Sequence, residues 1–450
     1  MSGRNERLRG ESDDVSHKEV IVKRQMRRWR GLLIVVAVLI VAAMLLAACG
    51  SDEPSSDASP TGGEPKAGGQ YNFMIGAEPI SIEPLNTQES EGAQVQHQVF
   101  QGLYILQLQP DGTTKAVPDL AESMEVNEDA TVFTFKIRQG VMFQPPVNRE
   151  VKAQDFVDSW SYNAQADNKS ATTYIIAPIE GIDPETGYAD GPVLSGVKAL
   201  DDYTLEVTLQ YPFADFTATL VHPITHVFPV DYAEEIGRNA FFDKPVGTGP
   251  YVVEEWKHNQ YITLQQWPDY WNKDGASENS AGPGYVETIN FPIFADDNTA
   301  WLAFQKGDID YARVPVGNFK AAQNDPKTQD GTWTVEAYPS TSVYFISVAM
   351  NKPMLGGDEN LPIRAALNMA ADREAVSNIV NEGISIPSDS IVPVTIPGYK
   401  AGLNPYPYAP DQAQAKLDDV TGTLPQDIPY WLNSGAGHDK LAEALLAGWQ

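Results

Sequence analysis

Alternating apolar and polar residues mark the clearest strands of this chain. Across residues 132–138, phenylalanine and isoleucine occupy every second position, with threonine, lysine and arginine between them. This period of two predicts a half-buried strand, because successive strand side chains point to opposite faces. Residues 203–210 repeat the pattern. Shorter runs predict further strands at residues 71–75, 261–265, 285–294 and 342–350.

Apolar residues recur at helical spacing in several stretches between these strands. Residues 155–164 and 297–305 are expected to be helical, and Gly307 supplies a stop for the second of them. Residues 362–381 predict one continuous helix, with Pro362 in its first turn and Gly383 beyond its end. Strands and helices mix without regular alternation, which indicates an α/β fold with more than one lobe.

A stretch of 18 residues without charge, residues 31–48, ends at the only cysteine, Cys49. Five basic residues lie in the eight positions directly before this stretch: Lys23, Arg24, Arg27, Arg28 and Arg30. A basic segment followed by an apolar one predicts an export signal, with residues 1–30 as a cytoplasmic n-region and 31–48 as the h-region. The stretch is also just long enough to span a bilayer as an uncleaved helix. Both interpretations place the residues after Cys49 outside the cytoplasm.

The part of the chain after the apolar stretch begins as a linker and is strongly acidic. Residues 49–69 are rich in Ser, Pro, Gly, Asp and Glu, which predicts a flexible tether before a folded part that starts near Gln70. The chain holds 31 Lys and Arg against 60 Asp and Glu, and from Cys49 onward these become 22 and 55, a net charge of −33. Nucleic acid is therefore not an expected partner.

The familiar catalytic and metal-binding motifs are not found in the sequence. It contains no G-x-S-x-G, H-E-x-x-H, Walker or EF-hand pattern. His222 and His226 have a spacing that suits metal ligands on a helix, but Pro223 favours two ordinary loop histidines instead. Gly247 and Gly249 begin a partial dinucleotide motif that Pro250 would interrupt. No enzyme activity, cofactor or metal is expected.

The end of the apolar stretch, Leu46-Ala47-Ala48-Cys49, resembles the bacterial lipoprotein box. The resemblance implies that the thiol of Cys49 receives a diacylglyceryl group and that the signal is cut just before it. Two acyl chains would hold a soluble domain at a membrane, whereas one chain is marginal. We therefore expect an exported protein anchored by lipid at the outer face of the cell membrane.

Several segments, in order, resemble the extracellular solute-binding proteins of family 5, the oligopeptide- and dipeptide-binding lipoproteins of ABC importers. The segments are VFQGLY at 99–104, VPDLAES at 117–123, FTFKIRQGVMF at 133–143, VKAQDFVDSW at 151–160, VGTGPY at 246–251, DYW at 269–271, FQKGDID at 304–310 and IRAALNMAADRE at 363–374. The resemblance explains Gly247 and Gly249 as turn residues. It also places Lys152 where the family usually has a threonine that caps a helix.

The resemblance implies a two-lobed, type II periplasmic-binding-protein-like fold. The first lobe would cover residues 70–295, with an inserted subdomain at about 100–200, and the second lobe would cover 296–450. In the family the chain continues through another α/β segment after the region of Asp411 and returns to the first lobe. Residues 441–450 predict a helix with Leu441, Leu445 and Trp449 on one stripe and no cap after it, so we expect a C-terminal truncation.

The implied function is that of a monomeric receptor that captures a peptide, or a related small solute, and delivers it to ABC permease subunits. Peptides are the commonest ligands of the family, and some relatives bind nickel, haem or sugars. A secreted hydrolase with dispersed carboxylates and a sensor or chaperone without transport remain alternatives.

The candidate ligand contacts are polar residues next to predicted strands. They are Asn86 and Glu89 after the first strand, and Tyr344 and Asn351 near the strand that begins at residue 342. Each could equally be a turn cap or a partly buried surface residue. Trp301 and Trp431 are expected to be core residues rather than stacking platforms.

Overall fold

The computed structural model describes residues 66–109, 114–275, 277, 282–337, 342–394, 396, 399–420, 422–432 and 437–449. The expected signal segments, Cys49 and nearly all of the expected linker lie outside these residues. Within them, no helix is both long enough and apolar enough to cross a membrane.

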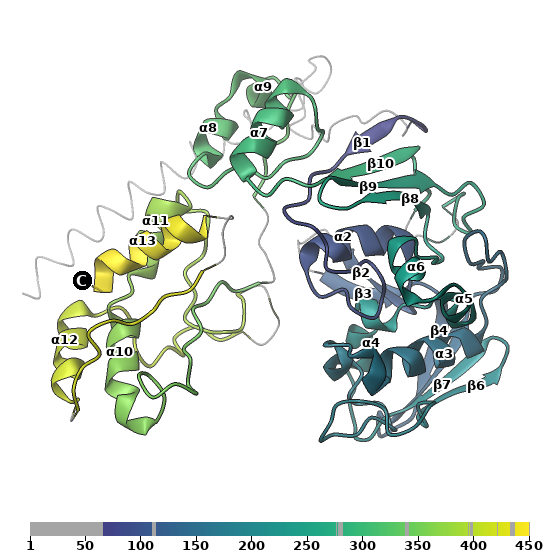
Figure 1. Cartoon of the computed structure of the whole chain (residues 1–450), viewed down its shortest axis with the longest axis horizontal. Coiled ribbons are helices and arrows are strands. Elements are labelled where there is room, and N and C mark those ends of the chain that lie inside the picture. Colours follow the sequence, from purple (N-terminus) through teal and green to yellow (C-terminus); the bar gives the residue numbers. More distant parts are fainter. Residues whose placement is uncertain are drawn as a thin grey trace, which may run out of the picture. The chain divides into compact units, whose positions relative to one another are not determined.

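A four-stranded sheet joins the beginning of the described chain to a segment more than 200 residues later (Figure 1). Its strands are β1 (Gln70–Asn72), β10 (Thr288–Pro292), β9 (Tyr261–Gln266) and β8 (Tyr251–Lys257), in that order. Strand β1 runs parallel to β10, with Gln70 opposite Thr288, and the other pairs are antiparallel. The strands predicted at residues 71–75, 261–265 and 285–294 are confirmed as β1, β9 and β10. Strands β1 and β10 end earlier than predicted, and β9 extends one residue further.

A second four-stranded sheet is antiparallel throughout and contains the two clearest predicted strands. Its order is β4 (Ala121–Val126), β5 (Val132–Ile137), β7 (Thr204–Thr208) and β6 (Val197–Asp201). Phe133, Phe135 and Leu205 are at most 1% exposed, as the alternation predicts. Strands β2 (Tyr104–Leu108) and β3 (Thr114–Pro118) form a separate antiparallel pair.

Helices and short turns complete the part of the chain up to β10. They are α2 (Ser90–Val99), α3 (Ala153–Ala164), α4 (Phe216–Thr219), α5 (Val230–Ile236), α6 (Arg238–Asp243) and the 3₁₀ turns η1 (Ala166–Asn168), η2 (Thr173–Ile175) and η3 (Pro223–Thr225). Helix α3 packs on β6 and β7. At its start Asp155 Oδ2 accepts a hydrogen bond from the Lys152 backbone N–H at 2.7 Å, so the helix is capped although the family's threonine is replaced. One large apolar core runs through this part, from Ile75 to Phe291.

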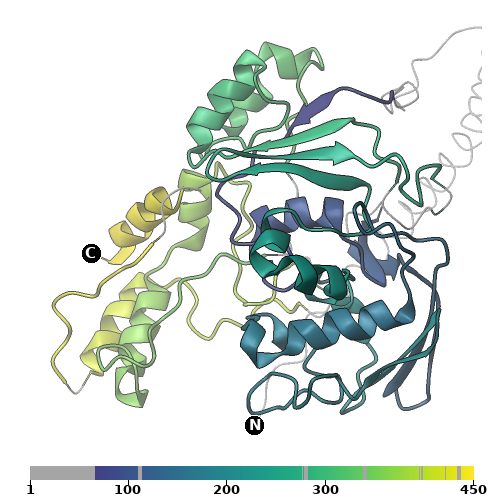
Figure 2. The ribbon, with the colours of Figure 1, turned by 45° about the vertical axis from the view of Figure 1, so that its right-hand side comes forward.

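The described chain after β10 contains helices and irregular segments, and no strand. Its helices are α7 (Asp297–Lys306), α8 (Phe319–Gln323), α9 (Pro326–Gln329), η4 (Asp358–Asn360), α10 (Leu361–Met369), α11 (Arg373–Val380), α12 (Pro410–Asp418) and α13 (His438–Trp449). Helix α12 packs on α10 and α13 packs on α11 (Figure 2). The buried clusters here are small, such as the one formed by Ala366, Met369 and Ala413.

Two predictions for this later part of the chain are wrong. Residues 342–350 form no strand, because no described strand lies beside them to complete a ladder, and Phe345 is 61% exposed. The single helix expected over 362–381 is two helices, α10 and α11. Asp372 separates them by capping α11, since its Oδ1 accepts a hydrogen bond from the Ala375 N–H at 2.8 Å.

Candidate ligand-binding site

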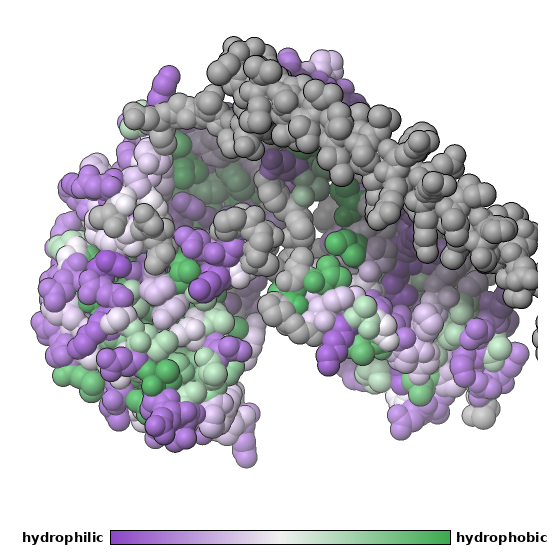
Figure 3. Space-filling view, turned by 180° about the vertical axis from the view of Figure 1, so that it is seen from behind, coloured by the Kyte–Doolittle hydropathy of each residue, from purple (hydrophilic) through white to green (hydrophobic). Residues whose placement is uncertain are grey.

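A large hollow among the described residues has a volume of about 3090 Å³. Its lining comes from the segment that runs from α7 to α13, together with Tyr71 on strand β1 of the first sheet. Hydrophobic groups stand among hydrophilic ones on the face of the molecule shown in Figure 3. A partly apolar hollow of this size has room for a ligand of several residues.

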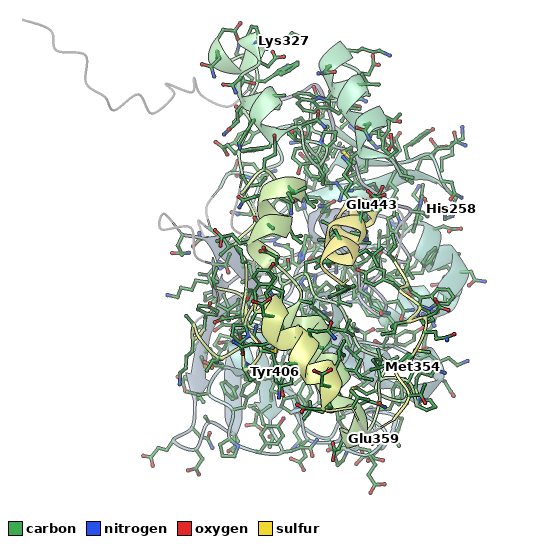
Figure 4. All side chains as sticks on the ribbon, turned by 90° about the vertical axis from the view of Figure 1, so that its left-hand side faces the viewer. His258, Lys327, Met354, Glu359, Tyr406 and Glu443 are labelled. Atoms are coloured by element: carbon green, nitrogen blue, oxygen red, sulfur yellow. The ribbon has the colours of Figure 1, made fainter. Side chains whose placement is uncertain are left out.

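One part of the lining is aromatic and is organised by α7. Asp296 caps this helix by accepting the Thr299 N–H at 2.8 Å, and Gly307, with φ of 85°, ends it. Trp301 and Phe304 lie three residues apart on one helix face, where their rings stack with centroids 5.2 Å apart. The ring centroids of Trp333 and Phe304 are 5.1 Å apart. The ammonium of Lys327, a residue of α9 that is labelled in Figure 4, lies 4.5 Å from the centre of the Trp333 ring.

A second aromatic group lies where β1 meets the segment after α7. Phe73 and Tyr311 stack with centroids 4.1 Å apart and planes 2° apart, and Tyr71 is 6.4 Å from Phe73. Tyr71 and Tyr311 line the hollow and are 37% and 39% exposed, so part of each ring is accessible there. Partial burial raises the pKa of Tyr71, and the nearby carboxylate of Asp310 adds to the effect.

Polar groups fix the backbone beneath these rings. Asp310 Oδ2 accepts hydrogen bonds from the backbone N–H of Asn72 at 2.8 Å and from its amide at 3.1 Å. Arg313 lies 3.4 Å from Asp297 on α7 and 3.9 Å from Glu91 on α2. A side chain at Gly76 would place its Cβ 1.7 Å from the Arg313 guanidinium, so the arginine side chain would have to move to make room for it.

The lining contributed by residues 384–394 is held by a carboxylate. Asp389 accepts hydrogen bonds from the Gly402 backbone N–H and from the Tyr399 hydroxyl, the latter at 3.0 Å. These bonds, the Gly402 N–H first, lower the pKa of Asp389. Asp389 therefore stabilises the loop in its ionised form.

The structure does not bring the four predicted contact residues together. Tyr344 lines the hollow, is 54% exposed and lies 5.1 Å from the His438 ring. Partial burial raises the pKa of the Tyr344 hydroxyl. Asn351 is exposed in a turn and is not part of the lining.

Asn86 and Glu89 hold local structure next to α2. The Asn86 amide, with its oxygen turned toward Arg238, accepts a hydrogen bond from Nη2 at 2.6 Å. The same guanidinium pairs with the buried Glu83 at 3.1 Å. Glu89 Oε1 accepts the Ile80 N–H at 2.9 Å.

Sequence reasoning missed Tyr71, Tyr311 and Trp333 as lining residues. Tyr311 directly follows the FQKGDID segment, but only the parallel bridge between Phe73 and Tyr311 shows that it faces the start of the chain. Trp431 is 91% exposed, so the prediction that it is a core residue is wrong, whereas Trp301 is partly buried in the aromatic group on α7. Within the described residues, no three His, Cys, Asp or Glu side chains are grouped closely enough to hold a metal ion.

The class of protein, a solute-binding protein, is given by the family to which the sequence is matched. The chain belongs to the bacterial extracellular solute-binding proteins, family 5, since the model of the family's middle region matches residues 115–450. The predicted resemblance to this family is therefore confirmed.

The chain is similar to longer curated proteins. It is 28% identical over 392 residues to the oligopeptide-binding protein OppA of Bacillus subtilis, covering 84% of this chain and 68% of OppA. It is 26% identical over 361 residues to the dipeptide-binding protein of Escherichia coli, covering 75% of this chain and 62% of that protein. The chain thus spans roughly two thirds of these relatives.

A solved structure confirms the fold. The periplasmic binding protein DppA of Helicobacter pylori, solved in complex with the peptide STSA, superposes with a TM-score of 0.63 at 23% identity. The match covers 79% of this chain and 67% of DppA. The predicted type II periplasmic-binding-protein fold is confirmed.

Proposed function

We propose that this protein is an extracytoplasmic receptor that binds a peptide, or a related small solute, and delivers it to an ABC importer. The observation that carries the proposal is the family match over residues 115–450, joined to the similarity with an oligopeptide-binding protein. The name of OppA and the peptide bound to DppA make peptides the favoured ligand class. The receptor acts as a monomer.

The lining of the hollow supports noncovalent capture rather than catalysis. Aromatic rings supply apolar contact area at low entropic cost, and exposed extended chain can pair with a peptide backbone. Tyr71 and Tyr311 offer ring faces beside the Asp310 carboxylate, which suits a ligand with both apolar and cationic groups. The receptor binds and releases its ligand without a chemical step, and its closure is a hinge motion stabilised by ligand.

We further propose that residues 70–295 form a first lobe, with an inserted subdomain at about 100–200, and that 296–450 form part of a second lobe. The large core from Ile75 to Phe291 supports the first boundary. The separate small cluster of Ala366, Met369 and Ala413 supports the view that the later residues pack as a second unit.

Membrane attachment through a lipid on Cys49 would keep the receptor near its permease. Replacing the thiol with a hydroxyl, Cys49→Ser, should abolish lipidation, because the thiol is the acylated group. In cells lacking the native gene, wild-type protein should incorporate labelled palmitate, sediment with membranes and restore peptide uptake. Cys49→Ser should stay unlabelled and soluble, with uptake reduced roughly tenfold or more because its effective concentration at the permease falls.

Ser51→Ala in the adjoining linker is the matched control and should behave like the wild type. An unlabelled Cys49→Ser protein that still sediments with membranes would show that residues 31–48 remain as a membrane helix. Wild-type protein that never restores uptake of any peptide would contradict the proposed delivery function.

A further inference from the structure

His226 is a buried histidine outside the ligand hollow, and the proposed function does not use it. It follows η3 directly and is 3% exposed. Its Nδ1 lies 2.9 Å from the amide nitrogen of Gln96 on α2. Its ring also presses on the backbone after α2, since a Cβ on Gly102 would lie 2.8 Å from His226 Cδ2. The imidazole therefore fills the contact between α2 and η3.

The hydrogen bond from Gln96 defines the protonation state in which this contact is made. An amide N–H that donates to Nδ1 requires the neutral imidazole, with its proton on Nε2. Gln96 is fully buried, and its Oε1 has no partner among the described residues. If Nδ1 gains a proton, it can no longer accept from the Gln96 amide, and the hydrogen bond that holds this contact is lost.

The groups that face His226 do not neutralise a charge on it. On α2 these groups are Gln96 and His97, and the ring centroids of His97 and His226 are 5.3 Å apart. From the segment before η3 they are His222 and the Val221 carbonyl. No carboxylate is among the groups that shift His226, and two of them are histidines that repel a positive charge once they are protonated.

We propose that His226 and Gln96 form a proton-operated switch. The neutral pair holds the C-terminal turn of α2 against η3, and proton uptake at Nδ1 releases that contact. The site binds a proton, and the part of the structure that responds is the contact between α2 and η3. Because the N-terminal turn of α2 carries Glu91, the partner of Arg313, the released helix is also the one that contacts the segment after α7.

The direction of the pH effect follows from burial. Burial lowers the pKa of His226 well below its usual range. Burial, with a smaller contribution from nearby His97, also lowers the pKa of His222 to about 4. A histidine whose pKa is lower in the folded than in the unfolded state binds its proton more weakly when folded. The contact is therefore intact above the ordinary histidine pKa of about 6.5, and it weakens as the pH falls below that value.

Hydrogen exchange of the full chain at pH 7.5, 6.5, 5.5 and 4.5 tests the switch, with rates corrected for intrinsic exchange. Amides of residues 95–103 and 220–228 should exchange at least tenfold faster at pH 4.5 than at 7.5, while those of β8 and β9 stay constant. The variant His226→Gln should lose this acid response. An equal acid response in that variant would overturn the proposal.

A second variant keeps the test decisive if His226→Gln does not fold. Gln96→Glu places a carboxylate opposite Nδ1, which pairs with the protonated ring and should remove the tenfold change. An unaltered acid response in Gln96→Glu would also overturn the proposal. The control is His258→Gln, which changes a half-exposed histidine on another hydrogen-bond network and should respond to acid like the wild type.

Discussion

Gly247→Ala should prevent stable folding of the part of the chain up to β10. A Cβ at this position would lie 2.1 Å from the Val99 carbonyl oxygen at the end of α2, and a backbone atom cannot swing aside. The same turn is held by Gln144, whose side chain accepts the Gly247 N–H at 3.1 Å and donates to the Gly249 carbonyl at 3.0 Å. Relieving the clash would break this buried network, at a cost of at least about 3 kcal/mol.

Urea unfolding of the purified variant measures that cost. The matched control is Gly191→Ala, where an added Cβ would have its nearest neighbour at 3.8 Å and no positive φ is required. We expect Gly191→Ala to unfold within about 0.5 kcal/mol of the wild type. A Gly247→Ala protein as stable as this control would contradict the close packing of the turn against α2.

Amides in the second sheet should exchange at least about a thousandfold more slowly than those of residues 343–349 in the 450-residue chain. The sheet strands β5 and β7 pair along their length and bury Phe135 and Val207 completely. Residues 343–349 belong to no helix or strand, and Phe345 is largely exposed. Hydrogen exchange of the native protein followed by mass spectrometry measures both regions in one sample.

The control for this comparison is α10, which packs on α12 and should show intermediate protection. Equal, strong protection of residues 343–349 and of β5 would contradict the description of the later segment as open chain. Residues 343–349 would then have to pair with another strand, as the sequence pattern predicts.

The sequence predicted those elements whose signal is local. Strands β5 and β7 alternate strictly because one face meets the core, so the pattern alone located them within about two residues. The GTGPY segment predicted a turn, although only the structure shows that Gly247 is required by the approach of Val99. The separation of α10 from α11 also has a local signal, because Asp372 is an N-cap residue. The apolar residues at helical spacing on both sides of Asp372 nevertheless predicted one continuous helix.

The residues that line the hollow meet only through the fold, so sequence patterns do not group them. Asn86 and Glu89 have the residue types of ligand contacts, yet Arg238 and the Ile80 amide engage them in local structure. Tyr71 and Tyr311 are 240 positions apart, and no local pattern connects them. Residues 342–350 have strand-like composition, but a strand also needs a neighbour, and composition does not supply one.

The central claim is that this family 5 protein binds peptides reversibly. Native mass spectrometry of the purified extracytoplasmic protein tests it most directly, after incubation with an equimolar mixture of short peptides, haem, nickel and sugars. We predict a one-to-one complex with short peptides of varied sequence that are released intact on denaturation. A protein that binds haem, nickel or a sugar and retains no peptide would contradict the account.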